Sequence, residues 1–232
     1  MTDQRESELA ANLLDVQARV AAACKAADRS VDDVTVIAVT KTWPADDVRR
    51  LAALGVRDIG ENRDQEAAPK AAACADLDLR WHFVGQLQTN KCRSVATYAD
   101  AVHSIDRPRL VAALDDAAQR IGRRLRCLIE VRLDERRGRA GAAPDDVGRL
   151  ADLVASSPSL ELAGVMGIAP LDQDPSPAFS RFAKIAEEVR AAHPAARWLS
   201  AGMSDDFEQA IAAGATHVRV GTALLGRRPP LR

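Results

Sequence analysis

The stretch Val34-Thr-Val-Ile-Ala-Val39 is a short run of mostly β-branched residues, and Lys41-Thr-Trp-Pro44 follows it almost directly. Such a run predicts a strand that is buried on both faces. Pro44 suits the first turn of a helix, and apolar residues recur behind it at helical spacing until Gly55. The stretch therefore predicts a strand followed by a helix, which is the repeating unit of an α/β fold.

The same alternation continues to the C-terminal end of the sequence. A helix over residues 5–27 precedes the first strand, and seven more strand-like segments follow it, at 56–59, 81–84, 101–103, 125–131, 160–166, 198–199 and 217–220. Helical patterns lie between them at 63–74, 107–121, 144–155, 177–192 and 205–213, with a shorter one after Asn90. Eight such units predict a single α/β domain over residues 1–232, a (β/α)₈ TIM barrel with an extra N-terminal helix. A doubly wound open sheet is the structural alternative.

The composition indicates an ordinary soluble protein. The formal net charge is -1, and the charged residues are mixed in sign, so nucleic acid and anionic membranes are not expected as partners. Residues 1–8 are polar without an apolar signal core, and no segment approaches the length of a membrane span. The four cysteines are widely spaced and include no CxxC pair, which argues against a metal site or a disulfide framework and favours a reducing cytoplasm.

Lys41 is the first candidate for chemistry. In a barrel of this kind the functional groups follow the strands at one rim, and Lys41 directly follows the first predicted strand. Partial desolvation there would lower its pKa and leave the amine free to attack an aldehyde. The alternative is a lysine that ends a strand and simply reaches water.

Two loops of small residues indicate a phosphate site. Residues 199–206 follow the seventh strand and include Gly202 and the hydroxyls of Ser200 and Ser204, while residues 218–223 follow the eighth strand. Glycine allows the backbone to approach a ligand closely, and barrels of this type often bind phosphate with these two loops. Helix capping by Ser204 or Asp205 is the simpler explanation for the first loop.

Arg219 lies between Val218 and Val220 in the eighth predicted strand. If the two valines face the helices, the arginine points into the barrel. A buried arginine needs a partner, and a ligand atom or the carboxylate of Glu61 could provide one. An internal salt bridge is the alternative without a ligand.

Six motifs recur in the order found in one known family. They are Val-Thr-Lys-Thr (39–42), Gly-Glu-Asn (60–62), Trp-His-Phe-Val-Gly-Gln-Leu-Gln-Thr-Asn-Lys (81–91), His-Ser-Ile-Asp (103–106), Leu-Ser-Ala-Gly-Met-Ser-Asp-Asp (199–206) and Val-Arg-Val-Gly-Thr-Ala-Leu-Leu-Gly-Arg (218–227). Together they cover essentially the whole chain, and the run at 81–91 is highly specific. The sequence resembles the YggS/PROSC family of pyridoxal phosphate homeostasis proteins.

The resemblance implies a barrel of the alanine racemase N-terminal type that binds pyridoxal 5'-phosphate (PLP) as a Schiff base on Lys41. It implies that Arg219 faces the pyridine nitrogen and that Asn62 lies near the ring. His82 and Gln86 would be scaffold for the pocket rim, and no catalytic residue is assigned. The remaining cofactor-binding residues, mainly for the phosphate, would be Ser200, Gly202, Ser204, Gly221 and Thr222.

The sequence departs from the common family pattern at Ala201, at Arg132 and at Arg139. These differences leave the lysine site intact but put in doubt any role of the loop Arg132–Arg139 that needs a lysine amine. The arginines of this loop could attract the anionic cofactor, or they could form an ordinary solvated loop.

The resemblance favours a function in vitamin B6 homeostasis. A permanently charged Arg219 disfavours protonation of the ring nitrogen, so the cofactor would be a weak electron sink, better suited to storage and delivery than to catalysis. The recipients would be PLP-dependent apoenzymes, and the protein would be a cytoplasmic monomer.

A small PLP-dependent amino-acid racemase is the first alternative. It would need a second acid or base, and the single tyrosine, Tyr98, precedes the fourth strand and is expected on the far side of the barrel. A barrel that binds another phosphorylated metabolite without covalent chemistry is the second alternative.

Overall fold

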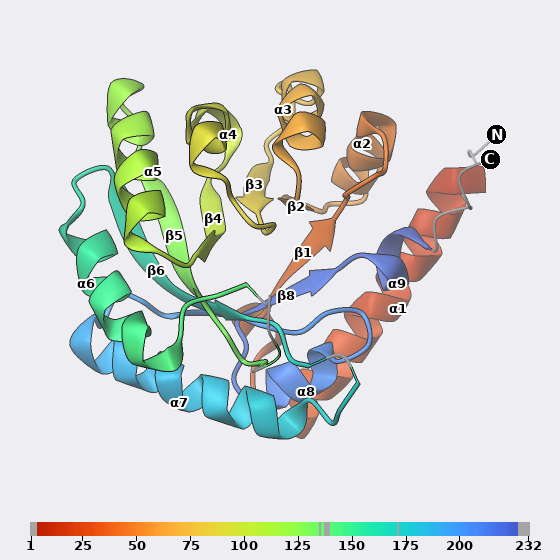
Figure 1. Cartoon of the computed structure of the whole chain (residues 1–232). Coiled ribbons are helices and arrows are strands. Elements are labelled where there is room, and N and C mark those ends of the chain that lie inside the picture. Colours follow the sequence, from red (N-terminus) through yellow and green to blue (C-terminus); the bar gives the residue numbers. More distant parts are fainter. Residues whose placement is uncertain (1–3, 135, 137–139, 171, 227–232) are drawn as a thin grey trace.

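The computed structural model describes residues 4–134, 136, 140–170 and 172–226. In this part of the chain, eight parallel strands close into a barrel in sequence order (Figure 1). The strands are β1 (Thr35–Val39), β2 (Asp58–Glu61), β3 (Arg80–Phe83), β4 (Ala101–Ile105), β5 (Leu125–Val131), β6 (Leu160–Gly167), β7 (Trp198–Ser200) and β8 (His217–Val220). The predicted barrel is confirmed, and the open-sheet alternative is wrong because β8 pairs with β1.

Helices cover the outside of the barrel. They are α1 (Gln4–Ala26), α2 (Ala45–Ala53), α3 (Asp64–Ala73), α4 (Cys92–Tyr98), α5 (Pro108–Arg120), α6 (Val147–Ser156), α7 (Ser176–Ala192), α8 (Phe207–Ala212) and α9 (Thr222–Leu225). Short 3₁₀ turns occur at Val31–Asp33, Thr89–Lys91 and Pro144–Asp146. The one-turn helix α9 is absent from the sequence prediction.

The start of β2 shows why one boundary was misplaced. The predicted strand begins at Val56, but Val56 instead closes helix α2, because its N–H donates to the carbonyl of Leu51 and Gly55 takes a left-handed φ of +93°. This is the Schellman arrangement that ends many helices. The strand consequently begins two residues later, at Asp58.

The extra helix α1 completes the helical layer beside β8. It packs against α8 and α9 with a buried stripe of apolar residues, namely Leu9, Leu13, Val16 and Val20. Arg5 and Asn12 donate side-chain hydrogen bonds of 3.0 Å to the carbonyls of Leu225 and Leu224. Because α9 has only four residues, α1 covers apolar surface that a longer last helix would otherwise bury.

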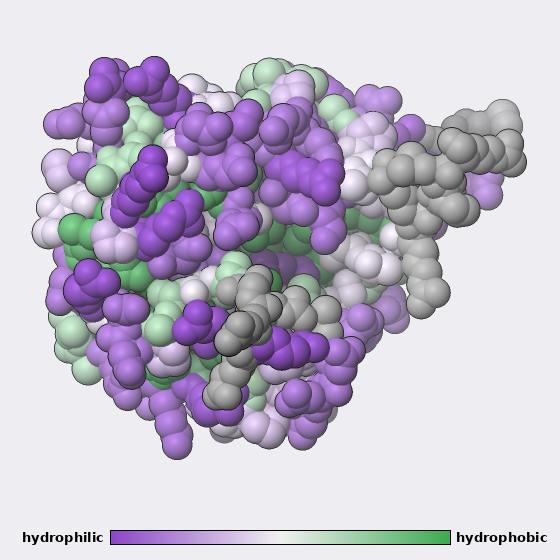
Figure 2. All heavy atoms as spheres, in the orientation of Figure 1, coloured by the Kyte–Doolittle hydropathy of each residue, from purple (hydrophilic) through white to green (hydrophobic). Residues whose placement is uncertain are grey.

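The hydrophobic core lies mainly between the sheet and the helices, and Val218 and Val220 belong to it. The face seen in Figure 2 is largely hydrophilic, with hydrophobic residues visible mainly in its recessed parts. Within the described residues no helix is both long enough and apolar enough to cross a membrane. The inside of the barrel, by contrast, contains buried polar side chains, among them His82, His103, Ser200 and Arg219.

Candidate functional site

Lys41 lies two residues beyond the end of β1, and its side chain is exposed. This exposure fits the alternative of a lysine that ends a strand and reaches water. Its neighbours differ from it, because Thr40 is completely buried and Thr42 adopts a positive φ of +69°. A β-branched residue rarely takes that conformation, so the backbone that carries Lys41 is strained.

A buried ion pair holds the residue before Lys41. Lys70 of α3 and Glu61 of β2 form this pair, and both side chains are almost fully buried. Thr40 donates its hydroxyl to Glu61 Oε1 at 2.6 Å, and Lys70 Nζ donates to the carbonyl of Thr40 at 2.8 Å. Burial raises the pKa of Glu61, although Lys70 and Thr40 oppose the shift, and Glu61 Oε2 has no hydrogen-bond partner among the described residues.

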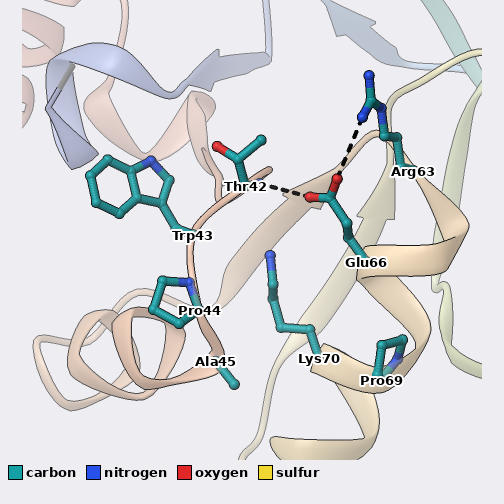
Figure 3. A pocket seen from close by; sticks show the side chains of 8 residues that line it. All are labelled: Thr42, Trp43, Pro44, Ala45, Arg63, Glu66, Pro69 and Lys70. Atoms are coloured by element: carbon teal, nitrogen blue, oxygen red, sulfur yellow. Dashed lines mark hydrogen bonds and ion pairs between the residues drawn. The ribbon is translucent and has the colours of Figure 1, made fainter. Parts of the chain in front are cut away.

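A second contact from α3 holds the residue after Lys41. The N–H of Thr42 donates to Glu66 Oε2 at 2.9 Å, and Arg63 lies on the other side of the same carboxylate (Figure 3). These residues line an open groove of about 660 Å³ together with Lys70. Both flanks of Lys41 are therefore anchored, while its own amine is left accessible.

Asn62 follows β2 at the same rim. Its Oδ1 atom is buried and has no hydrogen-bond partner among the described residues. A Cβ atom on Gly85 would lie 2.1 Å from the carbonyl oxygen of Asn62, so only glycine fits there. Asn62 and Gln86 line a groove of about 420 Å³. An unsatisfied buried oxygen at a groove is suited to a ligand with a hydrogen-bond donor.

The loops after β7 and β8 are joined to each other. Ser204 Oγ accepts a hydrogen bond of 3.1 Å from the N–H of Ala223, which leaves its own proton free to be donated. The carbonyl of Gly202 accepts a hydrogen bond of 2.9 Å from the N–H of Arg219. Gly202 has a φ of +89°, and a Cβ atom there would lie 2.7 Å from Phe207 Cα. Gly221 and the exposed Thr222 begin α9 beside this junction.

Arg219 is 5% exposed and points into the barrel, as expected. Its Nη1 donates to Ser200 Oγ at 2.8 Å, and its Nη2 donates to the carbonyl of Gly167 on β6 at 3.0 Å. The suggested partner Glu61 is wrong, because that carboxylate is paired with Lys70. Burial lowers the pKa of Arg219 to about 10, against opposing effects of Glu130 and Asp206, so it stays charged at neutral pH.

Ser200 lies below the rim rather than on it. Its side chain is fully buried, and its hydroxyl oxygen lies 3.0 Å from His103 Nδ1 as well as accepting from Arg219. His103 in turn contacts His82, which is the satisfied core histidine that was expected. The predicted contact of Ser200 with a phosphate stays a prediction.

Glu130 of β5 was not singled out in the sequence. Burial raises its pKa to about 7, and the nearby Asp106 adds to the shift while Arg219 opposes it. It lines a cavity of about 140 Å³ with Ala169. The useful sequence signal is its position, since it is the one acidic residue of β5 and lies next to the end of the strand, where it is buried.

Two further features of the sequence prediction are Tyr98 and the Arg132–Arg139 loop. Tyr98 ends α4 and lines a groove with Asp100 and Arg123, which precede their strands. Its hydroxyl, however, donates to Asp64 Oδ1 at 3.5 Å at the start of α3, so the expected placement at the far end of the barrel does not hold for the phenol group. In the loop, Arg136 pairs with Asp134 and Asp172, while residues 135 and 137–139 lie outside the described part.

Among the described residues no group of three or more potential ligands could hold a metal ion.

The comparisons with known proteins agree with the geometry. The chain matches the family described as the alanine racemase N-terminal domain over residues 12–229. A pyridoxal phosphate homeostasis protein of Mycobacterium tuberculosis (H37Rv) is 46% identical over 243 residues, covering 97% of this chain and 94% of the relative.

Two solved structures are similar in fold. PipY of Synechococcus elongatus with PLP bound superimposes with a TM-score of 0.82 at 35% identity, covering 94% of this chain and all of PipY. Alanine racemase of Corynebacterium glutamicum gives a TM-score of 0.72 at 15% identity, covering 98% of this chain and 64% of the racemase. At that identity, the second likeness concerns the fold alone.

Proposed function

Because the chain belongs to the pyridoxal phosphate homeostasis protein family, within the alanine racemase N-terminal domain family, we propose that it binds PLP covalently through Lys41 and serves PLP storage and delivery. The observation that carries the proposal is the exposed Lys41 amine at the end of β1, beside the joined loops of β7 and β8. An accessible amine suits a cofactor that has to be released again.

The residues of the rim fit this cofactor. PLP supplies an aldehyde that a lysine amine can attack and a phosphate that needs several donors. Ser204 offers a hydroxyl proton, and Gly202, Gly221 and Thr222 offer backbone at a cradle without bulky side chains. Asn62 supplies an unsatisfied buried oxygen near the ring position. Ser200 contributes through Arg219 in this arrangement, since its hydroxyl already accepts from that guanidinium.

The same residues favour holding the cofactor over turning over a substrate. A charged Arg219 facing the pyridine nitrogen keeps that nitrogen unprotonated and weakens the electron sink. Racemisation needs a second acid or base at the substrate, but the hydroxyl of Tyr98 donates to Asp64 of α3 in the helical layer, and burial raises the pKa of that hydroxyl. The likeness to alanine racemases is one of fold alone, so the carrier function is preferred.

The first test is the visible absorbance of the protein titrated with PLP, followed by borohydride reduction and peptide mass analysis. The expected result is one PLP fixed to Lys41 in the native protein and none in Lys41→Ala. Lys25→Ala is the matched control, because Lys25 is also exposed but lies at the end of α1. A native protein that never gains the adduct would contradict the proposal.

Delivery is tested separately from binding. We propose that the protein acts as a monomer in the cytoplasm and passes PLP to PLP-dependent apoenzymes. The loaded protein, freed of unbound PLP, is mixed with such an apoenzyme, and recovery of that enzyme's activity is followed.

The monomeric state and the enzyme alternative have their own tests. Light scattering gives the mass of the protein in solution, which tests whether it is a monomer. Racemisation of L-alanine that depends on Lys41 would favour the enzyme alternative instead.

A further inference from the structure

A continuous line of hydrogen bonds crosses the inside of the barrel from Arg219 to Asp58. Arg219 Nη1 donates to Ser200 Oγ at 2.8 Å, and Ser200 Oγ lies 3.0 Å from His103 Nδ1. His103 Nε2 lies 3.0 Å from His82 Nδ1. His82 Nε2 lies 3.0 Å from Asp58 Oδ1. Five strands contribute one residue each, and the cofactor site proposed above assigns no role to the two histidines.

The two ends of the line determine its direction. A guanidinium can only donate, and an ionised carboxylate can only accept. Asp58 is ionised, because hydrogen bonds from Arg80 and His82 outweigh burial and hold the pKa of that carboxyl well below its usual range. Arg80 Nε donates to Asp58 Oδ1 at 2.7 Å, and Arg80 Nη2 is paired with Oδ2.

With one proton in each link, the direction determines every tautomer. Ser200 accepts from Arg219, so its own hydroxyl proton goes to His103 Nδ1. His103 then carries its proton on Nε2 and donates it to His82 Nδ1. His82 also carries its proton on Nε2 and donates it to Asp58. Both histidines are neutral in this arrangement, and no donor or acceptor in the line is left without a partner.

The surroundings favour the neutral form of His103. It is completely buried, and burial, with the cationic forms of His82, Arg219 and His217 nearby, holds its pKa well below the usual range. A doubly protonated His103 would donate to Ser200 as well as to His82, leaving the hydroxyl proton of Ser200 without an acceptor in the line.

We propose that Ser200, His103 and His82 are positioning residues for Arg219, through a one-directional hydrogen-bond line in which both histidines carry their proton on Nε2. The line holds one Nη atom, the carbonyl of Gly167 holds the other, and the guanidinium plane is thereby oriented. That orientation matters for function only insofar as the proposed PLP site is correct, since the cofactor ring is what Arg219 would face.

The tautomers are tested on the cofactor-free full chain by ¹⁵N NMR of the imidazole nitrogens between about pH 6 and about pH 8. The expected result is the Nε2–H pattern for both His82 and His103. Ser200→Ala removes the donor to His103 Nδ1 and should give mixed tautomers at His103, while Ser200→Thr keeps the pattern. His193, which pairs with Asp152 near the surface, should not change.

Two outcomes of this measurement would overturn the line itself. One is a proton on Nδ1 of His103 in the native protein. The other is a Ser200→Ala variant that unfolds cooperatively and gives unchanged histidine signals. Neither outcome depends on whether the protein binds PLP, so a failure of the proposed function is recognised separately, by the absence of the Lys41 adduct.

The positioning role is tested by the affinity for PLP. His103→Leu removes the acceptor for Ser200, and the expected dissociation constant is about tenfold higher, because a hydrogen bond to a charged group is lost indirectly. In His103→Asn, the amide oxygen can still accept from Ser200, so most of the affinity should return. Neither change touches the rim. Disturbed tautomers with unchanged affinity in His103→Leu would contradict the positioning role.

Discussion

Strands β1 and β8 lie side by side, with Ile37 paired to Arg219, and each brings a cation to the rim, but the two cations are held in opposite ways. Lys41 is exposed, and only its neighbours Thr40 and Thr42 are anchored. Arg219 is buried, and its own guanidinium is fixed by Ser200 and Gly167. In the function proposed above, the amine of Lys41 reacts with the cofactor and releases it, which needs freedom, whereas the guanidinium of Arg219 orients the cofactor ring, which needs rigidity.

The largest expected difference between the two cations is in stability. Arg219→Leu should lower the free energy of unfolding by about 2–6 kcal/mol, because it leaves two buried acceptors, Ser200 Oγ and the carbonyl of Gly167, without their donor, at about 1–3 kcal/mol each. Lys41→Met should change it by less than about 0.5 kcal/mol, because the side chain is exposed. Urea unfolding of both variants measures the contrast, and similar losses for the two would show that Lys41 is part of the fold.

The next effect concerns the ion pair behind Lys41. Lys70→Met should cost about 3–4 kcal/mol, because Glu61 is left as an uncompensated buried carboxylate. The double variant Lys70→Met with Glu61→Leu should recover most of that loss. A double-mutant cycle by urea unfolding gives the coupling. If the losses of the two single variants simply add in the double variant, Lys70 and Glu61 do not stabilise each other. The pair would then not anchor the residue that follows β1.

A somewhat smaller effect is expected beside Arg219, at Glu130. Its pKa is raised from 4.5 to about 7, so the folded state prefers the protonated form. The stabilising contribution is complete below pH 4.5 and is lost as the pH rises through about 7, a difference of about 3 kcal/mol. Glu130→Gln should therefore match the native protein near pH 4.5 and exceed it in stability at about pH 8. If the free energies of unfolding of the two proteins vary with pH in parallel, the expected role of the Glu130 carboxyl is contradicted.

The smallest effect expected is at Thr42. Its φ of +69° suits glycine, so Thr42→Gly should be more stable than Thr42→Ala by about 1 kcal/mol. Thr35 begins β1 and has no positive φ, so there the order of the glycine and alanine variants should reverse. Thermal unfolding of the four variants tests whether the strain is confined to the rim.

Most of the barrel and several rim positions could be predicted from the sequence. The alternation of apolar strands and helices is local information, and Lys41 and Arg219 were placed by their position relative to a strand. The partner of Arg219 and the depth of Ser200 could not be predicted. The contribution of His103 and Glu130 was missed for the same reason, since each looks like an ordinary polar residue in a buried strand.

The physical reason is the stagger of a closed barrel. Alternation tells which side chains face inward, but the stagger decides which inward side chains meet. Here the register shifts between Val102 and Ile105 on β4, and again at Cys127 on β5. The sequence by itself therefore determined the strands, the helices and the lysine at the rim. Only the tertiary structure decided that Arg219 meets Ser200 and Gly167 rather than Glu61, because the stagger of the strands decides which inward-facing groups lie opposite Arg219.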